Sequence, residues 1–218
     1  MSRLKEIIKF YLQNPIRLFV VPITWLPYFK FIRDTRDYQS GINFDIWFKQ
    51  KILNLGGNRD AYWPVHWTSK VYNSNKVLVG IDAYPGIMNG CYIQGIGGIK
   101  IGDYTQIAPN VVIVSANHDV YDTRIHIEKP VIIGKYCWLG AGSKIMPGVV
   151  LGDFTIVGAG AVVTKSFPDG YCILGGVPAD VIRNLDREKC ILYSHEKLYN
   201  GYIPHSKFEE FRAKRLHV

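Results

Sequence analysis

The sequence of 218 residues lacks several features that would assign it to a familiar class. The uncharged, apolar stretch of residues 18–29 holds 12 residues and contains Pro22 and Pro27, whereas a membrane-spanning helix needs about 20 apolar residues. No secretory signal, G-x-G-x-x-G motif or P-loop is visible, and the 21 glycines follow no collagen period. These absences argue against a membrane-spanning, secreted, dinucleotide-binding or collagen-like protein, and we expect a cytoplasmic one.

Cysteine is also scarce, with four residues at Cys91, Cys137, Cys172 and Cys190. They form no C-x-x-C pair and no spacing typical of a metal site, so we expect reduced thiols. The hydrophobic content of 48% excludes intrinsic disorder and is enough for one large core.

Negative charge is scarce at one end of the chain. Residues 1–76 carry twelve Lys and Arg against five Asp and Glu, whereas residues 77–168 carry six of each. A neutral body argues against a nucleic-acid-binding protein. The basic segment fits a partner that is anionic, such as a membrane surface or a phosphate-bearing ligand.

Glycine, by contrast, is concentrated, with seventeen of the 21 residues between Gly80 and Gly176. In this region an aliphatic residue recurs every six residues, and a second residue, usually small or β-branched, stands two positions before it. The aliphatic positions are Ile101, Ile107, Ile113, Ile133, Leu139, Ile145, Leu151, Val157 and Val163. The second positions are Ile99, Thr105, Val111, Val131, Cys137, Ser143, Val149, Thr155 and Ala161. A helix has an apolar period of 3.6, so this pattern excludes one.

A six-residue period predicts a coil of short straight segments with a corner after each. The aliphatic residue and the residue two positions before it point to the same side of a strand, because side chains alternate, and both enter a narrow interior. Three segments close one coil, and successive coils stack about 4.8 Å apart. The sequence therefore predicts an all-β solenoid.

The motifs that carry this period are I101-G-D-Y-T-Q-I, I133-G-K-Y-C-W-L-G-A-G, I145-M-P-G-V-V-L-G-D-F and the closing G175-G-V-P-A-D-V-I-R. They resemble the hexapeptide-repeat acyltransferase family, in particular its galactoside/maltose and polysaccharide O-acetyltransferase branch. The resemblance covers residues 77–185 and implies a left-handed parallel β-helix. Residues 1–76 are then a helical and aromatic cap, and residues 186–218 a C-terminal helix and tail.

Two breaks interrupt the period. Residues 77–98 are out of register, so the first coil is expected to be irregular, and a loop of about residues 119–130 is expected to leave the coil. Outside the repeats, apolar spacing predicts a helix over residues 4–12. Further helices are expected over residues 42–55, with a stop at Gly56 and Gly57, and around residues 187–199 in a polar and aromatic segment.

His118 stands where the coil gives way to the extruded loop, and the resemblance implies that it is the catalytic base. A neutral imidazole would take the proton of an acceptor hydroxyl as its oxygen attacks a thioester. His126, in the same loop, is the rival base. Only these two histidines fall within residues 77–185, so a zinc site of three histidines is not expected.

The resemblance also implies acetyl-coenzyme A as donor. Trp138 matches a position beside the pantetheine arm, although an outward Trp could equally cover a subunit interface. Ala141 stands where relatives often carry Ser, which leaves oxyanion stabilisation to backbone N–H groups. Asp180 departs from the Lys or Arg of relatives. The remaining implied donor contacts are Ala159, Thr164, Lys165 and Arg183.

The acceptor site has weaker signals. Asn89, in the irregular coil, lies near a substrate-contacting amide of sugar-acetylating relatives, although a turn Asn explains it as well. The other candidates, in the loop with His118, are Asp119, Tyr121 and Arg124.

We therefore expect an acetyl-CoA-dependent O-acetyltransferase that acts on a hydroxyl of a sugar or glycan, assembled as a homotrimer. The alternatives are an amino-sugar N-acetyltransferase, an antibiotic acetyltransferase and an inactive hexapeptide scaffold trimer. Residues 1–36, basic and aromatic, could lie in a membrane interface or pack against the β-helix and its copies.

Overall fold

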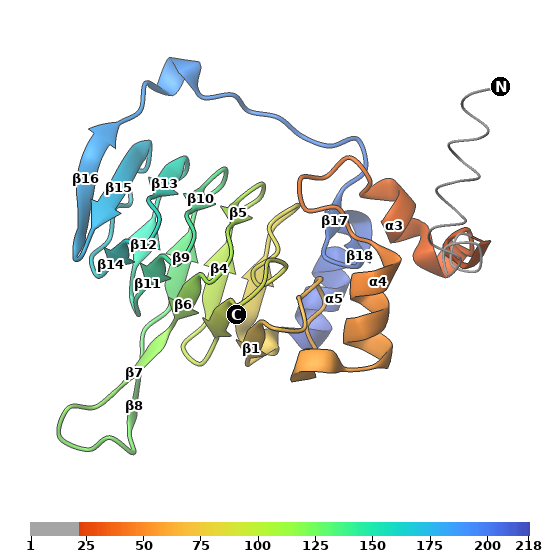
Figure 1. Ribbon diagram of the computed structural model, residues 1–218, viewed down its shortest axis with the longest axis horizontal. Helices are drawn as coiled ribbons and strands as arrows, with labels where there is room; N and C mark the ends of the chain where they lie inside the picture. The colour runs from red at the N-terminus through yellow and green to blue at the C-terminus, as the bar shows by residue number, and fades with distance from the viewer. Residues whose placement is uncertain (1–21) are drawn as a thin grey trace.

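The computed structural model describes residues 22–218, and the helix expected over residues 4–12 lies outside them. The predicted all-β solenoid is confirmed as a parallel β-helix with three sheets and helical flanks (Figure 1). The first sheet contains β1 (Lys70–Tyr72), β3 (Tyr92–Gln94), β6 (Val112–Val114), β11 (Lys144–Ile145) and β14 (Val162–Val163). The second contains β2 (Val77–Val79), β4 (Ile99–Ile101), β9 (Val131–Ile133) and β12 (Val150–Leu151). The third contains β5 (Gln106–Ile107), β10 (Trp138–Leu139), β13 (Thr155–Val157), β15 (Cys172–Gly176) and β16 (Ala179–Asn184).

The strand register confirms the six-residue period. Trp138 pairs with Ile156 and Lys144 with Val162, so one regular coil takes 18 residues, or three hexads. Both members of every predicted inward pair are at most 5% exposed. Two of the polar members find partners inside the coil, since the hydroxyls of Thr105 and Thr155 donate to the carbonyls of Gly134 and Gly152.

One coil is longer than the others. Trp138 pairs with Gln106, 32 residues earlier, so 14 residues more than a regular coil are inserted. The insertion contains an antiparallel hairpin of β7 (Ala116–His118) and β8 (His126–Glu128), which projects away from the body of the solenoid (Figure 1). The sequence predicts that a loop leaves the coil here, and the structure shows that two paired strands hold this loop.

The N-terminal cap is built from short helical turns: η1 (Pro27–Phe29), α3 (Lys30–Asp34), α4 (Phe44–Trp47), the π-helical η2 (Phe48–Ile52) and η3 (Leu55–Gly57). The expected helix over residues 42–55 is confirmed as α4 and η2. The side chain of Asn43 caps α4 by accepting the N–H of Ile46 at 2.9 Å. At Gly56, with φ of +80°, a Cβ would stand 2.4 Å from the carbonyl oxygen of Trp67, so only glycine fits this stop.

The prediction of a helix around residues 187–199 is wrong. Only η5 (Arg187–Lys189) forms there, and residues 185–198, the strap, run extended along one edge of the β-helix (Figure 1). Beyond the strap lie β17 (Tyr199–Asn200), β18 (Ile203–Pro204), η6 (His205–Lys207) and α5 (Phe208–Arg215), beside the N-terminal cap. The short η4 (Ser74–Lys76) precedes β2.

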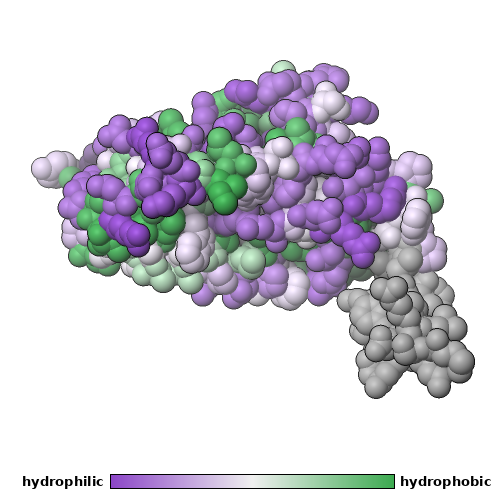
Figure 2. All heavy atoms as spheres, turned by 90° about the horizontal axis from the view of Figure 1, so that it is seen from above, coloured by the Kyte–Doolittle hydropathy of each residue, from purple (hydrophilic) through white to green (hydrophobic). Residues whose placement is uncertain are grey.

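The strap follows a column of stacked rings, which explains why it is not helical. Tyr104, Tyr136, Phe154 and Tyr171 occupy successive turns of one edge, with neighbouring ring centroids 4.9–5.1 Å apart. All four have a positive φ, and the stacking offsets part of that backbone strain. Tyr193 of the strap packs 4.9 Å from the Tyr104 ring. Figure 2, seen from the strap side, shows separate hydrophobic patches on a largely hydrophilic surface.

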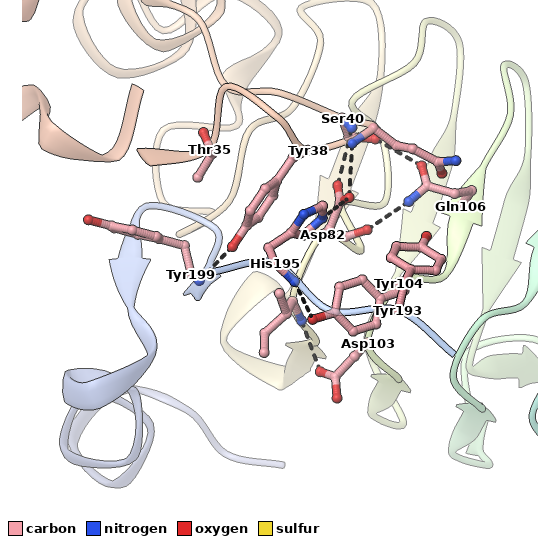
Figure 3. Close-up of polar contacts among 12 residues, drawn as sticks. Thr35, Tyr38, Ser40, Asp82, Asp103, Tyr104, Gln106, Tyr193, His195 and Tyr199 are labelled. Atoms are coloured by element: carbon pink, nitrogen blue, oxygen red, sulfur yellow. Dashed lines mark hydrogen bonds and ion pairs between the residues drawn. The ribbon is translucent and has the colours of Figure 1, made fainter. Parts of the chain in front are cut away.

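A buried carboxylate joins the cap, the β-helix and the strap (Figure 3). The fully buried side chain of Asp82 accepts the backbone N–H groups of Gln39 and Ser40, at 3.0 and 3.1 Å. His195 Nε2 lies 3.0 Å from the same carboxylate, and its ring stacks on Tyr38. Burial raises the pKa of Asp82, and these hydrogen bonds oppose the rise. Since an unpaired buried charge is strongly destabilising, Asp82 fixes the position of all three segments.

The four cysteines are unpaired, as expected from their spacing. Cys91, Cys137 and Cys172 lie in the core, and burial raises the pKa of the Cys137 thiol to about 11. Among residues 22–218, no helix is long and apolar enough to cross a bilayer.

Candidate active site

The β7–β8 hairpin positions His118 at the last residue of β7, directly opposite His126 of β8. Its tip is held by local polar contacts: the Asp119 carboxylate accepts the N–H groups of Tyr121 and Asp122, and Asp122 pairs with Arg124 at 2.8 Å. Asp119 and Arg124, two of the predicted acceptor contacts, therefore have structural partners in the hairpin. Tyr121 is 96% exposed and touches little of its own chain.

The tautomer of His118 follows from its neighbour. Nδ1 lies 2.5 Å from the backbone carbonyl oxygen of Thr123. Because a carbonyl can only accept, Nδ1 carries a proton, and in the neutral form of the ring Nε2 holds the lone pair. The side chain is exposed, and its ring centroid lies 4.6 Å from that of His126. The sequence contains no sign of this contact, because any residue supplies a backbone carbonyl.

The three sheets of the β-helix form the faces of a triangular prism. The predicted donor contacts lie on two different parts of this prism. Trp138 lies on the outer face of the third sheet, 54% exposed, and Ala141 and Ala159 follow β10 and β13 on the edge between the third and first sheets. These two turns stack directly, since Gly160 N donates to Ala141 O. Asn89 belongs to the same edge, because its carbonyl accepts the N–H of Asn110, which lies between β5 and β6.

Thr164 and Lys165 lie instead on the edge that carries His118. They follow β14, and His118 lies beyond the end of β6, two coils earlier in the same sheet. At the usual strand spacing, two coils are about 10 Å. The third sheet, with Trp138, is the face opposite this edge. In one protomer, His118 therefore shares an edge with Thr164 and Lys165, and it does not share one with Trp138, Ala141, Ala159 or Asn89.

Asp180 has a partner that the sequence did not reveal. Its carboxylate lies 3.1 Å from Lys165 Nζ, and both side chains are more than half exposed. The N–H of Val181 and, after it, Lys165 hold the pKa of Asp180 below its usual value. The carboxylate thus offsets part of the positive charge of Lys165. Arg183 lies on the same strand, β16, opposite Ile173.

Trp138 also borders a groove of about 330 Å³ beneath the strap, with Gln39, Gln106, Tyr136 and residues of the strap among its lining.

Among residues 22–218, no group of three His, Cys, Asp or Glu side chains is arranged to hold a metal ion. A metal-free site stays a prediction.

Comparison with known proteins places this geometry in a family. Residues 130–165 match the model described as bacterial transferase hexapeptide (six repeats). The chain is 38% identical over 155 residues to a galactoside O-acetyltransferase of Escherichia coli. The aligned region covers 69% of this chain and 73% of the relative. The chain therefore belongs to the hexapeptide-repeat acyltransferase family and is an acetyltransferase homologue within it.

Two further matches extend this comparison. A putative colanic acid biosynthesis acetyltransferase of Escherichia coli is 37% identical over 89 residues, which are 40% of this chain and 48% of the relative. A solved structure of a galactoside acetyltransferase in complex with coenzyme A is 28% identical in sequence, and the match covers 64% of this chain and 70% of that one with a TM-score of 0.52. The chain thus spans about half of one relative and about 70% of the others.

Proposed function

We propose that this protein transfers an acetyl group from acetyl-coenzyme A to a hydroxyl group of a sugar or glycan, in the cytoplasm, with His118 as general base. The observation that carries the proposal is the contact between His118 Nδ1 and the Thr123 carbonyl, which leaves Nε2 ready to accept a proton. The coenzyme A complex and the sugar-acetylating activity named for relatives support the donor and the acceptor class.

The chemistry is a direct acyl transfer. Nε2 of His118 takes the proton of the acceptor hydroxyl as that oxygen attacks the thioester carbonyl. The negative charge then falls on the carbonyl oxygen, and backbone N–H groups stabilise it, because Ala141 offers no hydroxyl. When the intermediate collapses, the carbon–sulfur bond breaks, and the imidazolium returns its proton to the coenzyme A thiolate. The products are the acetyl ester and the free thiol.

The placement of the donor contacts favours a site shared between copies. His118 and Trp138 occupy an edge and the opposite face of one prism, so one thioester cannot meet both in a single chain. If the hairpin of one protomer lies along the third sheet of the next, His118 comes close to the neighbour's donor face. A closed ring of three such contacts is a homotrimer.

The acceptor class can be tested by release of the coenzyme A thiol across a panel of acceptors. We expect release with glycosides and oligosaccharides whose hydroxyls are free, and an alkali-labile acetyl ester in the product. Preference for an amino group, seen as an alkali-stable amide, would contradict the O-acetyltransferase assignment. Absence of coenzyme A binding in a calorimetric titration would identify the inactive scaffold instead.

The Lys165–Asp180 pair predicts a change in donor affinity. In Asp180→Asn, Lys165 loses its carboxylate partner and is free to contact a donor phosphate, so we expect the KM for acetyl-coenzyme A to fall about two- to fivefold, the scale of an exposed ion pair. The matched control is Asp169→Asn, which removes an exposed carboxylate without a recorded ion pair among residues 22–218. An unchanged KM in Asp180→Asn, or the same fall in the control, would remove Lys165 from the donor site.

A further inference from the structure

The N-terminal end of the solenoid exposes large apolar side chains. Trp25 and Tyr28 are 70% and 68% exposed, far more than rings that belong to a core. We call this region the cap surface; its exposed members are Ile23, Trp25, Leu26, Tyr28, Phe48, Ile52, Leu53, Leu55 and Trp67. The Tyr28 ring lies 5.9 Å from that of Trp47 in α4, which joins the η1 and η2 parts of the surface.

Cations alternate with these apolar groups. The guanidinium of Arg33 lies 5.5 Å from the Trp25 ring, and Lys49 Nζ lies 4.0 Å from the Trp67 ring. Arg59 donates to the carbonyl of Ile52 at 2.9 Å. Aromatic rings mixed with Lys and Arg are typical of surfaces that meet the interface of a bilayer, where rings reach the acyl boundary and cations reach phosphate.

A cavity of about 690 Å³ borders the cap surface at Tyr28 and lies between the cap, η4 and α5. Its lining includes Tyr28 together with three cations, Lys51, Arg59 and Arg215, and one carboxylate, Asp60. Among residues 22–218, no carboxylate lies within 4.0 Å of any of the three cations, so none has an ion-pair partner there. The cavity is large enough for the head group of a lipid.

Lys51 is the most buried of these cations. Its amine donates to the carbonyls of Arg59 and Ala61, both at 2.6 Å, and lies 5.2 Å from the ring of Tyr202. Burial lowers the pKa of Lys51 to about 8, and the charge of Asp60 opposes this fall. Because no carboxylate of the described residues is close enough for an ion pair, the desolvated ammonium group is only partly compensated, and an anion in the cavity would supply further negative charge.

We propose that the cap surface docks on a lipid bilayer with anionic head groups, and that Lys51, Arg59 and Arg215 bind the phosphate of one such lipid. Charge decides between a bilayer and a second copy of the chain as the occupant. A second cap surface would carry the same excess of cations and repel the first, whereas an anionic leaflet attracts it. The proposal takes the membrane alternative that the sequence left open for residues 1–36 and applies it to α4, η2 and α5, and it is independent of the acetyl-transfer reaction.

The test is co-flotation of the full chain with vesicles at about 0.1 M salt, an ionic strength at which surface charges still act over about 10 Å. We expect flotation with phosphatidylcholine vesicles that contain phosphatidylglycerol and none with phosphatidylcholine alone. In the double variant Arg59→Gln/Arg215→Gln, the ratio of bound to free protein should fall at least about tenfold. The charge-matched control, Arg187→Gln/Lys189→Gln on the strap, should float like the unaltered protein.

A second variant, Trp25→Ser/Leu26→Ser, separates the bilayer from a protein partner. It should also lose flotation, while its oligomeric mass by light scattering and its activity on a soluble acceptor stay unchanged. Failure of the unaltered chain to float would overturn the proposal, as would equal losses in the cap and strap variants. A change in mass without a change in flotation would assign the surface to contact between copies, and binding of inorganic phosphate without flotation would leave only a free-anion site. Either result contradicts bilayer docking.

Discussion

Replacement of His118 by alanine is expected to lower kcat for acetyl transfer by at least about 100-fold, the usual contribution of a positioned general base. The hairpin should survive the change, because its strand pairing and the Asp119 contacts at its tip do not use the imidazole. The measurement is release of the coenzyme A thiol with both substrates saturating. Assembly is checked by light scattering, so that a loss of rate is not a loss of fold.

His126→Ala is the matched control for this experiment. The two rings are neighbours in the same hairpin, 4.6 Å apart, but the contact with the Thr123 carbonyl belongs to His118. We expect His126→Ala to retain most of the activity. If His118→Ala kept near-normal activity, or if only His126→Ala lost it, the assignment of the base would be wrong.

The body of the fold could be predicted from the sequence because one physical rule repeats through it. A coil closed by three short strands admits only side chains that fill a narrow interior, so Ile, Leu and Val recur with small or β-branched residues two positions earlier. The buried pairs from Ile99 to Val163 all follow this rule. The hairpin interrupts the six-residue period, and the strands before and after it still point the same residues of each pair inward. The position of the insertion could therefore be predicted from the sequence as well.

The flanks obey no such rule. The sequence predicts a helix around residues 187–199, yet Ile191 and Leu192 are 77% and 72% exposed on an extended strap. The strap depends on contacts distant in sequence: Tyr193 packs on Tyr104, and His195 pairs with Asp82, 113 residues away. One signal was present, since an aromatic ring follows Gly-Asp or Gly-Lys at 104, 136 and 154. This recurrence marks the ring column on which the strap lies.

The individual residues of the candidate site could be predicted from the sequence, whereas their arrangement in space could not. The resemblance located His118 and the donor contacts along the chain, but the period alone does not say which positions share an edge. The structure assigns His118, Thr164 and Lys165 to one edge and Asn89, Ala141 and Ala159 to another. The partners of His118 and Lys165 could not be predicted either, because one is a backbone carbonyl and the other is a departure from the family pattern.

The central claim is that each reaction uses His118 of one chain and the donor face of another. Two variants test this claim, one that lacks the catalytic base and one whose donor site is blocked. His118→Ala lacks the base, and Ala159→Tyr places a bulky ring on the exposed turn where the donor is proposed to bind. Alone, each should assemble normally and be inactive. The two chains are co-expressed with different tags, and oligomers that carry both tags are purified.

Thiol release by these mixed oligomers is the decisive measurement. In a ring of three that contains both kinds of chain, about one-third of the sites combine an intact His118 with an intact donor face, so about one-third of the normal activity should return. Mixed oligomers as inactive as the separate variants would mean that base and donor face belong to the same chain, and would contradict the account.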